Sequence, residues 1–146
     1  MASIMRDLGE VWRCANLYRM EEYGDSGVGS YQDSYIVDIC NHPGLTQEQL
    51  SRLMYVHKSN ACRQVASLEG KGFVERRPDP ADRRNLLVYP TDKAFAALEK
   101  IRAVHARWKE LLLEGFSEDE CAALAAFLGR LADNAKRAAA RGEKNP

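Results

Sequence analysis

The sequence has few of the features that mark secreted, metal-binding or membrane proteins. Its four cysteines, Cys14, Cys40, Cys62 and Cys121, are scattered singly, with no CxxC pair and no histidines at zinc-ligand spacing. No hydrophobic run approaches the roughly 20 residues that a membrane span needs, and the first residues, MASIMRDLGEVWR, lack the apolar core of a signal peptide. We therefore expect a cytoplasmic protein with free thiols, no metal site and no membrane partner.

Catalytic and nucleotide-binding motifs are also missing. The three histidines, His42, His57 and His105, have no carboxylate or nucleophile at motif spacing. The glycine-rich stretch 24–30 lacks the GxGxxG spacing of a phosphate-binding loop and is typical of a flexible turn. The sequence therefore predicts no catalytic residues, no cofactor and no enzymatic activity.

The 146 residues, 45% of them hydrophobic, fit one folded domain, residues 1–146. Apolar residues at helical spacing predict a helix within residues 1–23 and a shorter helix with Tyr35, Ile36, Ile39 and Cys40 on its buried side. The segment Asn41-His42-Pro43-Gly44 ends the second helix, because residues before proline disfavour the helical conformation.

Residues 45–70 have the pattern of two helices joined by a short turn. Thr46 and Gln49 are spaced as a capping box for the first helix. Residues 55–57 form the turn, and the second helix covers 58–70. The expected buried side chains are Leu50, Leu53 and Met54 in the first helix and Ala61, Val65 and Leu68 in the second.

Two short strand patterns, residues 73–77 and 85–90, flank a segment rich in Pro and Asp. A β-hairpin directly after a helix-turn-helix is a wing. We thus expect a mainly α fold with a small β-wing (α+β): a winged helix-turn-helix over 31–90, with its recognition helix at 58–70 and its wing at 73–90.

The last third is helical, with a second capping box at Ser117 and Glu120. One compact core cannot cover the apolar faces of both terminal segments. We therefore predict a homodimer formed by residues 1–23 and 92–140. The most regular apolar stripe contains Cys121, Leu124, Ala125, Leu128, Leu131, Ala132 and Ala135.

The net charge of zero hides an uneven distribution. Residues 57–90 hold seven basic and four acidic side chains, a net charge of +3, whereas residues 1–56 have a net charge of −4. The positive segment contains the second helix of the motif and the wing, where a DNA backbone would be met. The predicted DNA contacts are Ser59, Asn60, Arg63, Gln64 and Ser67, opposite the buried stripe of the helix, and Arg76, Asp82, Arg83 and Arg84 in the wing, where Asp82 orients an arginine.

In combination and order, HPGLTQEQLSRLM, KSNACRQVASLEGKGFVERR and DPADRRNLLVYPTDKA resemble the MarR family of winged-helix transcriptional regulators over nearly the whole chain. The resemblance implies a homodimeric repressor on double-stranded, pseudo-palindromic operator DNA. It would place Ser59, Asn60, Arg63 and Gln64 in the major groove, and Asp82 and Arg84 on the wing in the minor groove. A winged helix used only for protein contacts is the alternative.

The resemblance also implies a small-molecule effector, often an anionic aromatic, bound between the dimer helices and the winged domain. Five aromatic residues either line that pocket or belong to the core: Trp12, Tyr18, Tyr31, Tyr35 and Trp108.

Cys14, four residues before Tyr18, resembles the redox-active cysteine of the peroxide-sensing OhrR branch, although Tyr31 and Tyr35 do not fall where that branch keeps its partner tyrosines. The alternative is a buried structural thiol.

Overall fold

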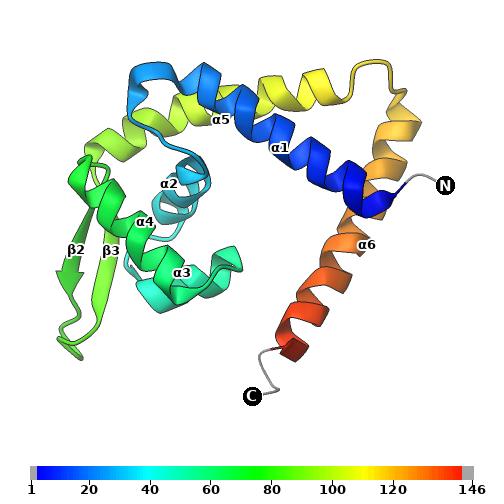
Figure 1. The fold of residues 1–146 in the computed structure, drawn as a ribbon. Coiled ribbons are helices and arrows are strands. Elements are labelled where there is room, and N and C mark those ends of the chain that lie inside the picture. The colour runs from blue at the N-terminus through cyan, green and yellow to red at the C-terminus, as the bar shows by residue number, and fades with distance from the viewer. Residues whose placement is uncertain (1–2, 143–146) are drawn as a thin grey trace. The chain divides into compact units, whose positions relative to one another are not determined.

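A computed structural model describes residues 3–142, which form six α-helices and a three-stranded antiparallel sheet (Figure 1). The chain divides into two units, with the boundary between Trp108 and Lys109. The first unit contains the helix-turn-helix and the sheet, and the second contains the end of α5 and all of α6. This architecture confirms the predicted fold class. Residues 1 and 2 of the first predicted dimerisation segment and residues 143–146 of the predicted domain lie outside the described residues.

Helix α1 (Ile4–Tyr23) begins at Ser3, whose hydroxyl accepts a hydrogen bond from the Arg6 amide. The helix ends at Gly24, and the 3-10 helix η1 (Gly24–Ser26) and a left-handed Gly27 complete the predicted turn. Within α1, only Ala15 and Tyr23 are buried. Helix α2 (Gln32–Asn41) lies in the core, where its predicted apolar side is buried together with Gln32 and Asp33.

Helices α3 (Gln47–Met54) and α4 (Lys58–Gly70) form the predicted helix-turn-helix. The capping box is present, because Thr46 accepts a hydrogen bond from the Gln49 amide and the Gln49 side chain accepts one from the Thr46 amide. Tyr55 ends α3 in the left-handed conformation, with φ of 56°, and this sharp reversal directs the chain into α4. The predicted inward residues of α4 are completely buried: Ala61, Val65 and Leu68.

The prediction of a buried Leu53 is wrong, because its side chain is 41% exposed and Ser51 is buried in α3 instead. Leu50 and Ser51 are adjacent in sequence, so the buried face of this eight-residue helix is rotated relative to the stripe expected from leucine spacing.

The wing consists of β2 (Val74–Pro78) and β3 (Leu86–Pro90), which pair antiparallel with Arg76 opposite Val88. The short strand β1 (Leu45–Thr46), which the sequence patterns do not predict, adds to the other edge of β3 and gives the sheet order β1-β3-β2. Two residues are too few for a detectable alternation of polar and apolar side chains. Figure 1 shows the β2 and β3 hairpin extending beyond the helices of the first unit.

Helix α5 (Asp92–Leu112) buries Ala94, Leu98, Ile101 and Val104 in the core. Helix α6 (Glu118–Gly142) begins with the predicted Ser117 and Glu120 capping box and contains no buried residue. Cys121, on the predicted apolar stripe, is only partly buried in a single chain. None of the helices within residues 3–142 has the length and apolarity needed to cross a bilayer.

Candidate DNA interface and ligand pocket

The predicted base-reading residues of α4 fall into two groups. Ser59 and Arg63 are exposed on the outer side of the helix, as expected. Asn60 and Gln64, both half-buried, instead face α2: the Tyr35 hydroxyl donates to Asn60 Oδ1 at 2.7 Å, and Gln32 Nε2 donates to Gln64 Oε1 at 3.1 Å. The prediction that Asn60 and Gln64 lie opposite the buried stripe is therefore wrong, because both residues lie on the side of α4 that faces α2.

Gln32 connects α2 to α4 through a fully satisfied buried amide. Its carbonyl oxygen accepts from the Gly29 amide at 3.0 Å and from Lys71 Nζ at 2.7 Å. Both partners can only donate, so they fix the orientation of the amide and direct its NH2 group towards α4. The NH2 group donates to Gln64 and to Ser67 Oγ, the latter at 3.0 Å. Ser67, a predicted DNA contact, is therefore exposed but hydrogen-bonded to α2.

Arg76, another predicted DNA contact, is held by Glu69 at the end of α4. Its Nε and Nη2 donate to Glu69 Oε1 at 3.2 and 2.9 Å, and its backbone amide donates to Oε2 at 2.9 Å. These hydrogen bonds lower the pKa of Glu69. Arg76 therefore joins the wing to α4, and only part of its guanidinium faces solvent.

At the wing tip, Asp82 orients Arg84 as the sequence predicted. Arg84 Nε donates to Asp82 Oδ1 at 3.1 Å, Nη2 donates to Oδ2 at 3.2 Å, and the Arg84 amide donates to Oδ1 at 3.1 Å. The Arg84 side chain is nevertheless 91% exposed. Hydrogen bonds from Arg84 lower the pKa of Asp82. The pair presents a solvent-exposed guanidinium in a defined direction, and Arg83 beside it is also exposed.

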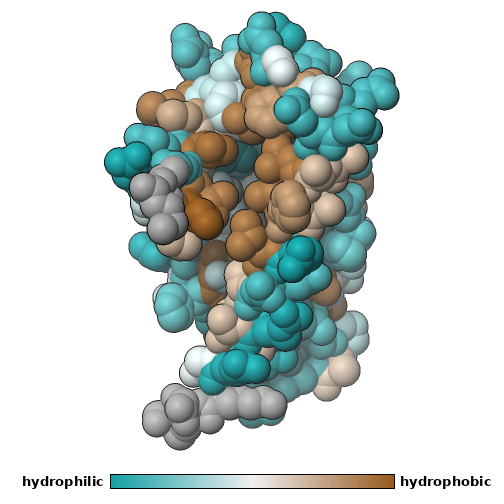
Figure 2. All heavy atoms as spheres, turned by 90° about the vertical axis from the view of Figure 1, so that its right-hand side faces the viewer, coloured by the Kyte–Doolittle hydropathy of each residue, from teal (hydrophilic) through white to brown (hydrophobic). Residues whose placement is uncertain are grey.

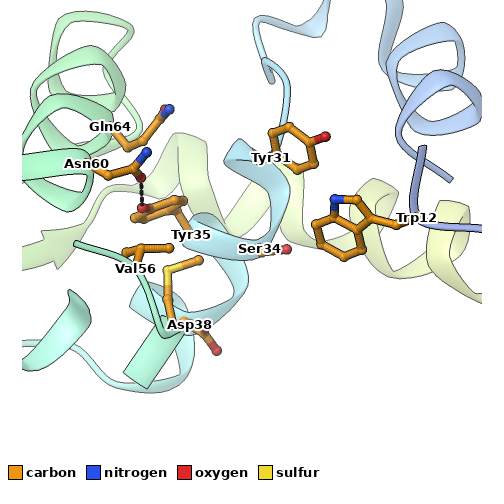
Figure 3. A pocket seen from close by; sticks show the side chains of 9 residues that line it. Trp12, Tyr31, Ser34, Tyr35, Asp38, Val56, Asn60 and Gln64 are labelled. Atoms are coloured by element: carbon orange, nitrogen blue, oxygen red, sulfur yellow. Dashed lines mark hydrogen bonds between the residues drawn. The ribbon is translucent and has the colours of Figure 1, made fainter. Parts of the chain in front are cut away.

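A cavity of about 410 Å³ lies in the first unit, next to α4 (Figure 3). We call it the Trp12 pocket. Trp12 and Tyr31 lie on one side of it, and Tyr35, Val56 and Asn60 on the other. Three of the five aromatic residues that the sequence predicts for a ligand pocket lie in this lining: Trp12, Tyr31 and Tyr35. Its nine lining residues are Trp12, Tyr31, Ser34, Tyr35, Asp38, Met54, Val56, Asn60 and Gln64.

The other two predicted liners, Tyr18 and Trp108, are not part of this lining. Their rings stack on each other, with centroids 5.1 Å apart, so each fills the space in front of the other. The lining also contains two polar residues that the sequence analysis did not predict, Ser34 and Asp38. Ser34 and Asp38 are four residues apart, so they lie on one side of α2, next to Tyr35, which also lines the pocket. This spacing is the sequence signal from which both residues could have been predicted.

A buried ion cluster joins α1, α2 and α5 near the pocket. Asp33, 2% exposed, accepts hydrogen bonds from the Tyr23 hydroxyl and His105 Nε2, each at 2.8 Å, and Arg19 Nη1 lies 3.4 Å away. Burial opposes ionisation of Asp33, but the hydrogen bonds from His105 and Tyr23 and the charge of Arg19 outweigh it and lower its pKa. Burial and the bond to Asp33 raise the pKa of Tyr23. The His105 side chain is partly exposed despite its contact with the buried Asp33.

Cys14 is exposed on α1, so the alternative of a buried structural thiol is wrong for a single chain. Within residues 3–142, no tyrosine hydroxyl bonds to its sulfur: Tyr23 bonds to Asp33 and Tyr35 to Asn60. A redox role for Cys14 stays a prediction. Of the remaining cysteines, Cys40 is buried, as expected.

Comparisons with known proteins agree with this geometry. The family model described as MarR family matches residues 32–86, the segment from α2 to the start of β3. The uncharacterized HTH-type transcriptional regulator YybA of Bacillus subtilis (strain 168) is 28% identical over 137 residues, which is 94% of this chain and 91% of that protein.

Two solved structures have the same fold over almost the full length. One, MarR, is 30% identical with a TM-score of 0.86, covering 97% of this chain and 95% of that chain. The other, a Listeria monocytogenes protein assigned to the MarR family and crystallised with a 26mer DNA, is 25% identical with a TM-score of 0.88, covering 99% of this chain and 97% of that chain. The chain has a winged helix-turn-helix, it matches the MarR family model, and it is 30% identical to the solved MarR over almost the full length of both chains. The chain therefore belongs to the MarR family of transcriptional regulators.

Proposed function

We propose that this protein is a homodimeric, sequence-specific DNA-binding repressor that releases DNA when a small aromatic molecule occupies the Trp12 pocket. The observation that carries the DNA-binding part is the exposed guanidinium of Arg84, held in place by Asp82 at the tip of the wing. An arginine that is both oriented and exposed is suited to a phosphate or to a narrow minor groove.

Helix α4 supplies the base-reading part of the proposed interface. Ser59 and Arg63 are the exposed candidates, and a bidentate arginine contact selects guanine in the major groove. Asn60, Gln64 and Ser67 contribute by holding α4 against α2, so that Ser59 and Arg63 are presented at a fixed angle. The Listeria monocytogenes relative crystallised with DNA supports this reading of the shared fold.

Exposed apolar side chains on the terminal helices support the proposed homodimer. On α1, Ile4 and Met5 are exposed, and on α6, Phe127, Leu128 and Leu131 are exposed. Figure 2 shows one face of the molecule, where hydrophobic residues are drawn in brown. Apolar surface of this extent is stabilised by burial against another chain. A two-fold dimer would also place two α4 helices on operator half-sites about 34 Å apart.

The pocket and the proposed DNA-reading helix share residues, which gives the effector a direct route to the DNA. Asn60 and Gln64 belong to both α4 and the lining, and Tyr35 lies between the pocket and Asn60. A ligand that displaces the Tyr35 ring breaks the 2.7 Å bond to Asn60 and changes the support of α4. Because two helices must match one turn of DNA, a small change in each protomer is enough to weaken binding.

DNA binding is tested by fluorescence anisotropy with labelled duplexes from the promoter region of the gene for this protein. We expect tight binding to one duplex and a steep loss of affinity with added salt. Arg63→Ala should cost about 1–3 kcal/mol on that duplex and less on unrelated duplexes. Lys100→Ala on α5 serves as the matched control. Equal losses from both variants would refute the assignment of Arg63.

Coupling between the pocket and α4 is tested with Tyr35→Phe, which keeps the ring in the lining and removes only the hydroxyl. We expect the variant to bind pocket ligands as the wild type does and to bind DNA with an affinity that responds less to them. Ligand affinity is measured by calorimetry and DNA affinity by anisotropy. An unchanged ligand response of DNA binding in Tyr35→Phe would exclude this route.

A further inference from the structure

The lining of the Trp12 pocket contains one charged side chain, the carboxylate of Asp38. Asp38 lies on α2, one turn after Ser34 and beside Tyr35. It is half-buried, and no hydrogen bond or ion pair within residues 3–142 involves its carboxylate. The other eight lining residues are aromatic, apolar or neutral polar. The lining itself therefore has one negative charge and no positive side chain.

The Asp38 carboxylate has no protein hydrogen-bond partner among the described residues and keeps part of its surface open to solvent. Burial raises the pKa of Asp38, and the charge of His42 opposes that rise only in part. A carboxylate that has lost water contacts without gaining a partner is stabilised by any donor or cation placed beside it. An anionic ligand would instead add a second negative charge to the same space.

Two arginines lie near the pocket without belonging to its lining: Arg63, whose charge acts on Tyr35, and Arg19. The Arg19 guanidinium lies 5.6 Å from the centre of the Trp12 ring, but its charge is paired with the buried Asp33, and Arg19 is not among the lining residues. Arg19 covers one face of the Trp12 ring, so a ligand would contact the part of the ring that lines the pocket. Tyr31, stacked on Trp12 with centroids 5.5 Å apart, and Tyr35 add further aromatic surface.

We propose that the Trp12 pocket binds an aromatic organic cation, with its rings against Trp12, Tyr31 and Tyr35 and its charged nitrogen beside Asp38. Aromatic rings with a carboxylate are the chemistry that binds ammonium and amidinium groups. A volume of about 410 Å³ accommodates a small drug-sized molecule. The proposal rests on the proposed function, since it names the chemical class of the effector. It replaces the anionic aromatic expected from the resemblance.

The test uses two probes of nearly the same shape and opposite charge, 2-naphthylmethylammonium and 2-naphthoate, measured by isothermal titration calorimetry at neutral pH. We expect the wild type to bind the ammonium at least about tenfold more tightly than the carboxylate. Asp38→Asn is nearly isosteric and should remove that preference. Glu99→Gln, which neutralises an exposed carboxylate on α5, should retain it.

Equal or tighter binding of 2-naphthoate by the wild type overturns the proposal without reference to any variant, as does binding of neither probe. An unchanged preference in Asp38→Asn overturns the role of Asp38.

Release of DNA is measured separately, by anisotropy with each probe added to the protein–DNA complex. If the ammonium binds selectively and DNA affinity does not change, the pocket binds an aromatic cation but does not control DNA binding, and the proposed effector function is wrong. If 2-naphthoate binds to the protein and causes it to release DNA, the pocket controls DNA binding as proposed, but the proposal of a cationic ligand is wrong.

Discussion

The Asp82 and Arg84 pair allows a test in which two electrostatic effects predict opposite signs. Replacing Asp82 with alanine removes a negative charge from the wing, so simple attraction to phosphate would strengthen DNA binding. The same substitution removes both side-chain acceptors of the Arg84 guanidinium and the acceptor of its backbone amide. If orientation of Arg84 matters more than total charge, Asp82→Ala weakens DNA binding.

The upper limit of the loss is set by removing Arg84 itself. Each neutralised phosphate contributes about 0.9 to the slope of log affinity against log salt, so Arg84→Ala in both wings of a dimer lowers the slope by about 1.8. At 0.1 M salt this corresponds to about 60-fold weaker binding. Asp82→Ala leaves the guanidinium free to find phosphate from other directions. We therefore expect a smaller loss of about three- to tenfold, which reflects the cost of restraining a long side chain.

The assay is anisotropy with one labelled duplex, titrated at four or more salt concentrations, for the wild type, Asp82→Ala, Arg84→Ala and Glu99→Ala. Glu99→Ala removes an exposed acidic side chain from α5 and reports the effect of net charge alone. Tighter binding by Asp82→Ala than by Glu99→Ala would refute the orienting role. An unchanged salt slope in Arg84→Ala would show that the wing does not contact phosphate.

Three further predictions concern stability and assembly. Asp33→Asn should lower the free energy of unfolding at pH 7 by about 2–4 kcal/mol, because it removes the charge that pairs with the buried Arg19. Since the pKa of Asp33 is lowered in the folded state, its stabilisation is present above the unfolded pKa of about 3.9 and is lost at lower pH, so urea unfolding curves of both proteins should converge on acidification. Gln32→Leu should cost about 2–3 kcal/mol, since it leaves Gln64 and Lys71 without their partner; an unchanged melting temperature contradicts this. Leu128→Glu should halve the mass measured by light scattering, and a retained dimer places the interface elsewhere.

Most of the fold follows from local patterns that the sequence displays openly. The capping boxes at Thr46 and Ser117 predicted where α3 and α6 begin, because the Ser or Thr side chain bonds to the backbone three residues later. The apolar spacing of Ala61, Val65 and Leu68 predicted the buried side of α4. These features depend on residues within one or two turns of each other.

The errors concern contacts between elements. Polar residues on an amphipathic helix are expected to face solvent, and nothing in the local sequence indicates that Asn60 and Gln64 have partners on α2. Those partners, Tyr35 and Gln32, lie 25 and 32 residues away in the chain. In the same way, the mutual stacking of Tyr18 and Trp108, which removes both from the lining, depends on the packing of α1 against α5.

The inward polar flank of α4 also bears on how this protein responds to a ligand. A purely apolar contact between α2 and α4 tolerates small sliding movements, because apolar packing has little directional preference. The hydrogen bonds from Gln32 and Tyr35 have defined donors and acceptors, so α4 is held in one position or released from it. The lining of the Trp12 pocket contains both partners of the Tyr35–Asn60 bond and one partner, Gln64, of a bond to Gln32. Neither Ser67 nor Lys71, which also bond to Gln32, belongs to that lining. An effector in the pocket would therefore loosen the start of α4, where Ser59 and Arg63 lie, while the end of the helix stays fixed to the core.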